Sequence, residues 1–214
     1  DLYHTFGKVQ TNLLVEGFYT ILDDVFALRD MDDAADGGKV KERYNGSGAT
    51  VRGFNVEGRA AFTRWFELQA GVTLQQSRYK EPEFWSEDAE VPPVRRMFRT
   101  PDAYGYFTAS FKPVRNFTAD LSGTCTGSML VQHMAGSGVA QDVAVSTPSF
   151  FDMNIRLSYD VRIYKEITMQ LYGGVQNLFN AYQKDFDKGV DRDSGYIYGP
   201  SLPRSWFVGA KISF

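Results

Sequence analysis

The side chains that could hold a metal ion or carry out catalysis are few and scattered along this sequence. Aspartates, whose oxygens are the ligands that calcium prefers, form two clusters: Asp30, Asp32, Asp33 and Asp36, and Asp185, Asp187, Asp191 and Asp193. Neither cluster follows the spacing of an EF-hand loop, so both are interpreted as solvated acidic loops. No serine–histidine–aspartate set is visible, and the protein is therefore not expected to be an enzyme.

The histidines and the cysteine offer no metal site or disulfide. His4 and His133 lie far apart, and neither has a spaced partner that would complete a zinc motif. His133 and Met134 open a polar segment where such a pair could reach a haem iron, but a loop position without a ligand is the preferred interpretation. Cys125 is the single cysteine and stands among small residues on an apolar face, where it serves as a small hydrophobic side chain. No metal and no cofactor are expected.

Aromatic and cationic side chains, which dominate binding energy once they are buried, gather in three long polar segments. The segment 80–99 is the richest of them. The residues that we expect to contact a ligand are Trp85, Arg95, Arg96, His133, Met134, Tyr196 and Tyr198. An exposed loop surface without a ligand is the alternative for the two arginines and the tryptophan.

The elements that must position these loops alternate with a period of two residues. Between Phe117 and Val131 every second residue is apolar or small and the intervening residues are polar, as on a strand with two different faces. The same pattern occurs at 65–79, 151–161 and 205–214, and weaker forms occur at 7–21, 48–62, 103–112 and 167–179. The sequence thus predicts eight strands and no helix, and most strands are long enough to cross a bilayer at a tilt. In 103–112, either the tyrosines or the phenylalanines could form the apolar face.

Short and long links alternate strictly between these strands. The short links are 63–64, 112–115 and 160–166, and the long ones are 22–47, 80–102, 132–149 and 180–204. Alternate links of an up-and-down barrel lie at the same rim, so the pattern predicts one rim of tight turns and one of long loops. Outer-membrane barrels have this asymmetry, with periplasmic turns and extracellular loops. We therefore expect an all-β, antiparallel up-and-down transmembrane barrel, with its C-terminus at the periplasmic rim.

Several motifs resemble those of a known family. Residues 174–182 (GVQNLFNAY) resemble the V-x-N-L-F-[ND]-x-x-Y pattern in the penultimate strand of TonB-dependent outer-membrane receptors. Residues 198–204 (YGPSLPR) are similar to the Pro-Arg element that opens the last strand of that family. The final alternating strand ends in Phe214 and resembles the signal recognised by the barrel-assembly machinery, to which Trp206 and Ile212 would also contribute. Residues 53–58 (GFNVEG) and 99–101 (RTP) add further matches upstream.

The resemblance implies a 22-stranded barrel plugged by an N-terminal domain, a size class known for outer-membrane transporters. Residues 1–214 would then be one domain, the C-terminal part of the barrel, without the plug and the earlier strands. The implied partners are the outer-membrane lipid bilayer, TonB through the missing N-terminal region, the barrel-assembly machinery and a small-molecule ligand. No Asp-Pro-Glu element follows 177–179, which favours a siderophore, haem or vitamin over a glycan.

Composition excludes some classes and leaves two alternatives. The net charge is −3 and no basic stripe occurs, so nucleic acid is not an expected partner. No apolar run approaches the roughly 20 residues of a transmembrane helix. One alternative is a complete eight-stranded outer-membrane barrel acting as an adhesin, a small channel or a lipid-modifying enzyme. The other is a soluble lipocalin-like barrel, although the Gly-x-Trp opening of lipocalins is absent.

Overall fold

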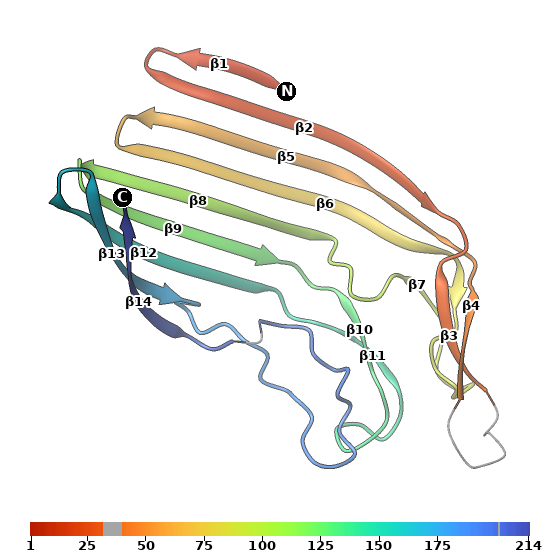
Figure 1. Ribbon diagram of the computed structural model, residues 1–214. Coiled ribbons are helices and arrows are strands. Elements are labelled where there is room, and N and C mark those ends of the chain that lie inside the picture. The colour runs from red at the N-terminus through yellow and green to blue at the C-terminus, as the bar shows by residue number, and fades with distance from the viewer. Residues whose placement is uncertain (32–39, 201) are drawn as a thin grey trace.

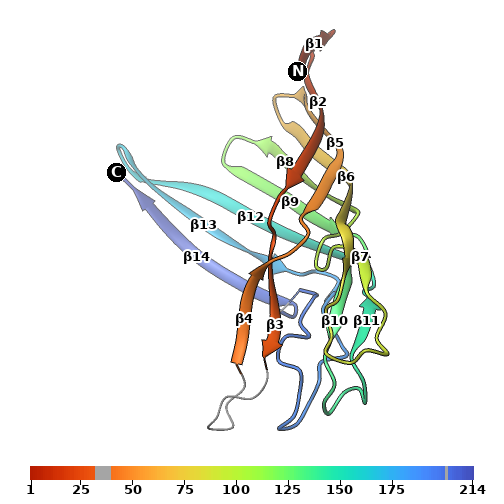
Figure 2. The ribbon, with the colours of Figure 1, turned by 90° about the vertical axis from the view of Figure 1, so that its right-hand side faces the viewer.

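Strands joined by turns and loops make up the computed structural model, which describes residues 1–31, 40–200 and 202–214 (Figure 1). Most strands belong to one curved sheet that is seen nearly edge-on in Figure 2. Among the described residues, no helix is long and apolar enough to span a membrane. The all-β prediction is thereby confirmed.

The main sheet is antiparallel, and nine of its strands follow one another in chain order. These strands are β1 (Leu2–Phe6), β2 (Val9–Leu22), β5 (Ala49–Thr63), β6 (Phe66–Glu83), β8 (Ala103–Val114), β9 (Phe117–Thr126), β12 (Phe150–Tyr164), β13 (Ile167–Gln176) and β14 (Ser205–Ser213). All eight predicted strands are present, and β1 is an additional one. The sheet does not close on itself, so β1 and β14 form its two edges.

Five short strands lie within the long links. The strand β7 (Val94–Arg96) pairs with β6 in the main sheet. Two separate hairpins are formed by β3 (Phe26–Met31) with β4 (Val40–Asn45), and by β10 (Leu130–His133) with β11 (Val143–Ser146). The alternation did not predict these strands, because they are too short to show a period.

Two predicted strands end earlier than the sequence suggests. The segment predicted as one strand from 117 to 131 is divided: β9 ends at Thr126, the amide of Gly127 makes one more bond to the carbonyl of Ala103 at 2.8 Å, and a new strand, β10, begins at Leu130. The strand predicted to reach 179 ends at Gln176. Asn177 has a positive φ of 49°, which a strand does not accommodate.

Turns of two residues join the strands at the left-hand end of Figure 1. They are formed by residues 7–8, 64–65, 115–116 and 165–166. Gly7 begins the first of them with a φ of 63°, a conformation that glycine adopts without steric cost. All long links lie at the opposite end of the sheet, so the predicted division into a turn rim and a loop rim is confirmed as geometry.

One face of the sheet, the polar face, is cross-linked by hydrogen bonds between neighbouring strands. Asn55 on β5 donates to Glu16 on β2 at 3.0 Å and accepts from Thr73 on β6 at 2.8 Å. Ser110 on β8 likewise donates to Asp120 on β9 at 2.6 Å. Polar side chains on this face therefore satisfy one another across the strands.

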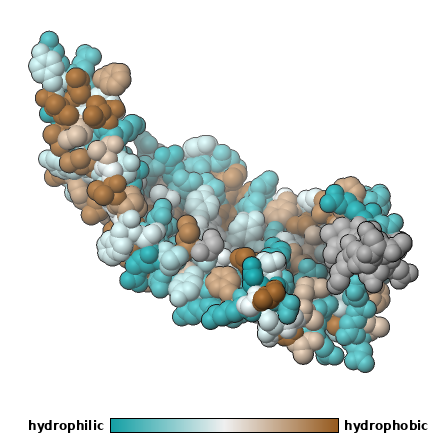
Figure 3. Space-filling model, turned by 60° about the horizontal axis from the view of Figure 1, so that its bottom comes forward, coloured by the Kyte–Doolittle hydropathy of each residue, from teal (hydrophilic) through white to brown (hydrophobic). Residues whose placement is uncertain are grey.

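The opposite face, the apolar face, carries large hydrophobic side chains that stay exposed. Register places Val15, Val56 and Val72 in one row across β2, β5 and β6. Leu157 on β12 is paired with Gly173, and Val208 on β14 is 90% exposed. Hydrophobic residues gather at the left-hand end of the view in Figure 3. Exposed apolar surface of this extent marks contact with a membrane or with another protein.

The register settles the ambiguity in 103–112. Phe107 is paired with Ala70 on one side and Gly123 on the other, so it belongs to the apolar face. Tyr106 belongs to the polar face, where its hydroxyl accepts a hydrogen bond from Gln69 at 3.1 Å. Cys125 lies on the apolar face, as predicted, and it is exposed.

We predict that the apolar face contacts lipid. Spin labels at Leu121 and Ile155, which are paired on this face, should be accessible to lipid-soluble oxygen and shielded from aqueous quenchers. Labels at Thr118 and Asp120 on the polar face provide the matched control and should behave in the opposite way. The reverse pattern would favour a soluble barrel with its apolar face inside.

Candidate ligand-binding loops

Three long links pack together at the loop rim. The hairpin β10–β11 lies beside the segment 177–204 in both ribbon views (Figures 1 and 2). The amide of Met134 donates to Asp193 at 2.8 Å, and the amide of Ser137 donates to the carbonyl of Asp191 at 3.0 Å. The third link, 84–102, joins the hairpin through a 2.7 Å hydrogen bond from Ser86 to Asp142. The loops thus form one connected unit, which we call the loop cluster.

His133 lies at the centre of the loop cluster and is buried. Its Nε2 lies 3.0 Å from both carboxylate oxygens of Asp187, whose side chain is only 4% exposed. The imidazole stacks on the ring of Tyr196, with 3.7 Å between the ring centroids and 6° between the planes. Hydrogen bonding from His133 lowers the pKa of the Asp187 carboxyl below its ordinary value of 3.8.

A second carboxylate, Asp185, is held by two tyrosines. Tyr196 donates to it at 3.0 Å and Tyr198 at 2.6 Å. Burial raises the pKa of Asp185, but the hydrogen bonds from Tyr198 and Tyr196 lower it by more, so the net pKa lies below its ordinary value. Burial, together with the bond to Asp185, raises the pKa of Tyr196 to about 12. The carboxylate is therefore ionised and the phenol is protonated at neutral pH.

Gln183 holds the backbone of the two tyrosines in place. Its side chain is 1% exposed, donates to the carbonyl of Tyr196 at 3.0 Å and accepts from the amide of Tyr198 at 2.9 Å. Arg99, in a left-handed conformation with φ of 57°, adds a 2.7 Å bond from its guanidinium to the carbonyl of Ile197. The prediction from sequence assigned neither residue to the site: Gln183 stands in no recognisable motif, and the RTP motif that contains Arg99 gave no sign of a contact nearly a hundred residues away.

The expectation that both aspartate clusters are solvated is wrong for half of the second one. Asp187 and Asp193 are not exposed and are bonded to histidine and backbone partners within the loop cluster, whereas Asp185, although bonded to two tyrosines, and Asp191 are both exposed. Among the described residues no group of three histidine, cysteine or acidic side chains could hold a metal ion. In the first cluster, Asp32, Asp33 and Asp36 lie outside the described residues, and the side chain of Asp30 is not described either.

The predicted ligand-contacting residues divide into two groups. His133, Met134, Tyr196 and Tyr198 come together in the loop cluster, as described above. Trp85 lies apart from them and packs edge-on against Phe98, with 5.4 Å between the ring centroids. It lines a cavity of about 250 Å³ that is also lined by Gln132, the residue before His133. None of the four residues of the first group lines this cavity.

The neighbouring arginines Arg95 and Arg96 differ in their surroundings. Arg95 is 54% exposed, and its guanidinium lies 3.7 Å from Glu81. Arg96 is more buried, and it bonds to Asp102 at 3.0 Å and to the carbonyl of Ser128 at 2.8 Å. Arg95 therefore faces solvent, as the alternative interpretation held, whereas Arg96 is a fixed part of the loop rim.

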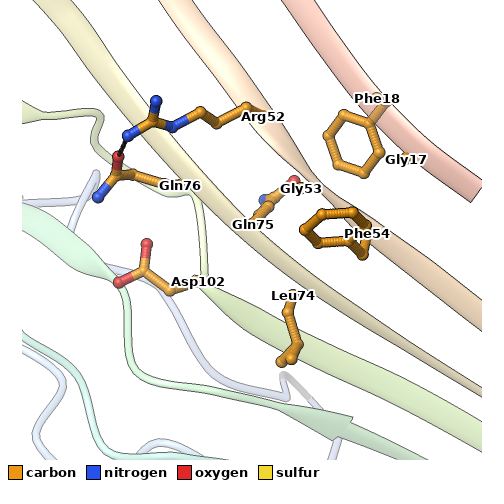
Figure 4. A pocket seen from close by; sticks show the side chains of 9 residues that line it. All are labelled: Gly17, Phe18, Arg52, Gly53, Phe54, Leu74, Gln75, Gln76 and Asp102. Atoms are coloured by element: carbon orange, nitrogen blue, oxygen red, sulfur yellow. Dashed lines mark hydrogen bonds between the residues drawn. The ribbon is translucent and has the colours of Figure 1, made fainter.

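A hollow of about 480 Å³ lies near the loop rim and is lined by residues from both faces of the sheet (Figure 4). Phe18, Gly53, Gln75 and Asp102 stand in one row across β2, β5, β6 and the start of β8. Position 53 requires glycine, because an added Cβ would lie 2.2 Å from the carbonyl oxygen of Leu74 and 2.8 Å from the ring of Phe18. The GFNVEG motif contains this glycine, but no sequence pattern indicated a hollow.

Of the three residues of the expected assembly signal, Ile212 and Phe214 lie at the turn rim, whereas Trp206 lies at the loop end of β14. Trp206 and Ile212 stand on the apolar face of the edge strand β14, and Trp206 is 77% exposed. Phe214 follows the strand and is fully exposed.

We predict that acid dissociates the loop cluster only at low pH. The pKa of Asp187 is lower in the folded chain than in the unfolded chain. Its stabilising contribution is therefore complete above about pH 3.8 and is lost as the pH falls through the lower folded value. The near-UV circular dichroism difference between the protein and its Tyr196→Leu variant should persist from neutral pH to about pH 4 and disappear below it.

The matched control for this titration is Asp187→Asn, which keeps the shape of the side chain and removes its charge. This variant should show a smaller signal at neutral pH and a shallower acid transition. An unchanged titration in Asp187→Asn would show that this carboxylate does not hold the loop cluster together.

Solved structures of outer-membrane receptors share the fold of this chain. The ferric-catecholate import receptor of E. coli K12 matches with a TM-score of 0.60 and 18% identity over 94% of this chain and 25% of that one. The ferric enterobactin receptor of Pseudomonas aeruginosa matches with a TM-score of 0.60 and 14% identity over 97% and 29%. The FrpB iron transporter of Neisseria meningitidis matches with a TM-score of 0.56 and 13% identity, also over 97% and 29%.

The sequence alone finds no such relatives, since no protein-family model and no curated protein matches it. This chain covers between 24% and 31% of the solved receptors. The match extends over nearly all of this chain, and it agrees with the motifs that resemble the TonB-dependent family. The chain has the fold of part of the β-barrel of a TonB-dependent outer-membrane receptor.

Proposed function

We propose that this chain forms part of the wall of an outer-membrane uptake receptor, and that its loop rim contacts the imported small molecule. The observation that carries the proposal is the division of one sheet into an exposed apolar face and a cross-linked polar face. A membrane barrel requires lipid on one face and a water-filled or plugged interior on the other. The apolar face would contact the outer-membrane lipid, and the polar face would line the lumen.

The proposed orientation follows from the two rims. Long loops of outer-membrane barrels are extracellular and short turns are periplasmic, so the loop cluster would face outward and the C-terminus would face the periplasm. TonB would engage an N-terminal region outside this chain, and transport would depend on that contact. The barrel would support ligand movement without catalysing a reaction.

A siderophore, haem or vitamin remains the proposed ligand class, ahead of a glycan. The similar solved structures include receptors described as importing ferric catecholate and binding ferric enterobactin. The absence of an Asp-Pro-Glu element after 177–179 favours the same choice. His133 is engaged with Asp187 and stacked on Tyr196, so a direct bond from His133 to iron would require the loop cluster to open.

The two alternatives receive less support from the geometry. A complete small barrel would have its first and last strands paired, whereas β1 and β14 are both edges here. A lipocalin-like barrel would place the apolar face inside. The hydrogen-bonded side chains of the polar face, such as Glu16 and Asn55, would then face outward.

We predict that the loop rim contributes to ligand binding. Replacing Trp85, Arg95 and Arg96 with alanine in the full-length receptor should weaken ligand binding to whole cells by about tenfold, because buried aromatic and arginine side chains dominate binding energy. The matched control is Lys112→Ala with Arg115→Ala at the turn rim, which should leave binding unchanged. Equal affinity of both variants at normal surface levels would remove this loop from the binding site.

We also predict that Phe214 serves assembly more than binding. Phe214→Ala in the full-length receptor should reduce the amount of folded protein in the outer membrane, measured as the heat-modifiable band on gels. Ser213→Ala, the neighbouring change, should have no such effect. Normal folded levels with reduced uptake would contradict an assembly role.

A further inference from the structure

A second cavity, of about 250 Å³, adjoins the hollow of Figure 4 on the loop side. The two cavities share Gln75, Gln76 and Asp102 in their walls, so they form one composite cavity. The additional lining residues are Ser77, Arg78 and Arg96. The amide of Met97 bonds to the carbonyl of Ser77 at 3.1 Å, which brings the segment after β7 over the end of β6 and encloses the site.

Ser77 presents an unused hydroxyl to this cavity. The residue is only 2% exposed, and its Oγ has no hydrogen-bond partner among the described residues. Buried hydroxyls are nearly always bonded, because an unbonded one loses its interaction with water and gains nothing in return. An apolar residue would serve packing better at this position, so the hydroxyl indicates a bound partner.

Arg96 supplies a second unused donor. Its Nε is buried and has no partner among the described residues, while another nitrogen of the same guanidinium is bound to Asp102 and to the carbonyl of Ser128. These two bonds fix the guanidinium in place and leave Nε available. The second cavity is lined by two arginines, Arg78 and Arg96, and one carboxylate, Asp102, and Arg52 lines the adjoining hollow, so the side-chain charges of the composite cavity sum to two positive charges.

The far part of the composite cavity is mostly apolar. The ring of Phe18 lies beside Gly53, where its Cζ would be 2.8 Å from an added Cβ. The site therefore has donors with an excess positive charge at one end and an aromatic wall at the other.

We propose that this composite cavity binds a small monocarboxylate with an aromatic or aliphatic body. The carboxylate oxygens accept hydrogen bonds from Arg96 Nε and Ser77 Oγ, and the body lies against the ring of Phe18. The role of this site as a contact for an imported ligand rests on the proposed receptor function.

The test uses 4-fluorobenzoate as the probe and the full-length protein folded in detergent, with binding followed by ¹⁹F nuclear magnetic resonance. Wild type should show saturable broadening and a shift of the probe signal. Ser77→Ala and Arg96→Gln should each weaken binding by about tenfold, since each removes a hydrogen bond to a charged group. The neutral analogue 4-fluorobenzyl alcohol should bind much more weakly than the carboxylate.

Arg115→Gln is the matched control, because Arg115 lies at the turn rim and does not line this cavity. It should bind the probe like wild type. Ser77→Ala should also unfold at the same temperature as wild type or a higher one without the probe, because it removes an unbonded polar atom. Saturating probe should raise the midpoint of wild type more than that of the variant.

Equal binding of the probe by wild type, Ser77→Ala and Arg96→Gln would overturn the proposal, and so would equal binding of the alcohol and the carboxylate. If Arg96→Gln does not fold, the comparison of wild type with Ser77→Ala alone tests the proposed carboxylate site. The binding measurement needs no cells, so it tests the cavity separately from the receptor function. Probe binding without ligand uptake would count against the receptor function alone, and uptake without probe binding would count against the cavity alone.

Discussion

The antiparallel register is the constraint on which the rest of this structure depends. Side chains on a strand alternate between faces, so a slip of one residue would exchange the two faces of that strand. Asn55 then could not bond to Glu16 and Thr73, and Val56 would leave its row with Val15 and Val72. The polar ladders and the apolar rows therefore fix the same register independently, which gives the sheet one consistent solution.

The loops at the loop rim are held in place by other interactions, since this rim has no apolar face to bury. Its order comes from polar pairs that are mutually satisfied. His133 is held by Asp187 and by the ring of Tyr196, and Tyr196 in turn bonds to Asp185. Networks of this kind stabilise one arrangement only when every member is bonded, because a buried polar group without a partner is costly. The rigidity of the loops thus depends on a few long-range contacts.

These two constraints explain what the sequence could predict. A strand shows its period within about ten residues, so the eight long strands and the alternation of turns and loops were all predictable. The cluster of His133 with Asp187 was not, because 54 residues separate the pair and no local pattern links them. The aspartates of 185–193 resembled a solvated acidic loop for the same reason. The edge strand β1 was missed because five residues carry too little periodicity.

The buried polar atoms without a partner show where this wall is prepared for contact. Among the described residues they belong to Ser77, Trp85, Arg96 and Asp152. Ser77 and Asp152 are near the loop ends of β6 and β12, and the other two lie in the link between β6 and β8. None belongs to the turn rim, where packing alone decides the side chains. Natural proteins retain such atoms mainly where a ligand, water or partner completes the bonding. The loop-side end of the polar face is therefore the part of this chain whose structure is least explained by stability alone.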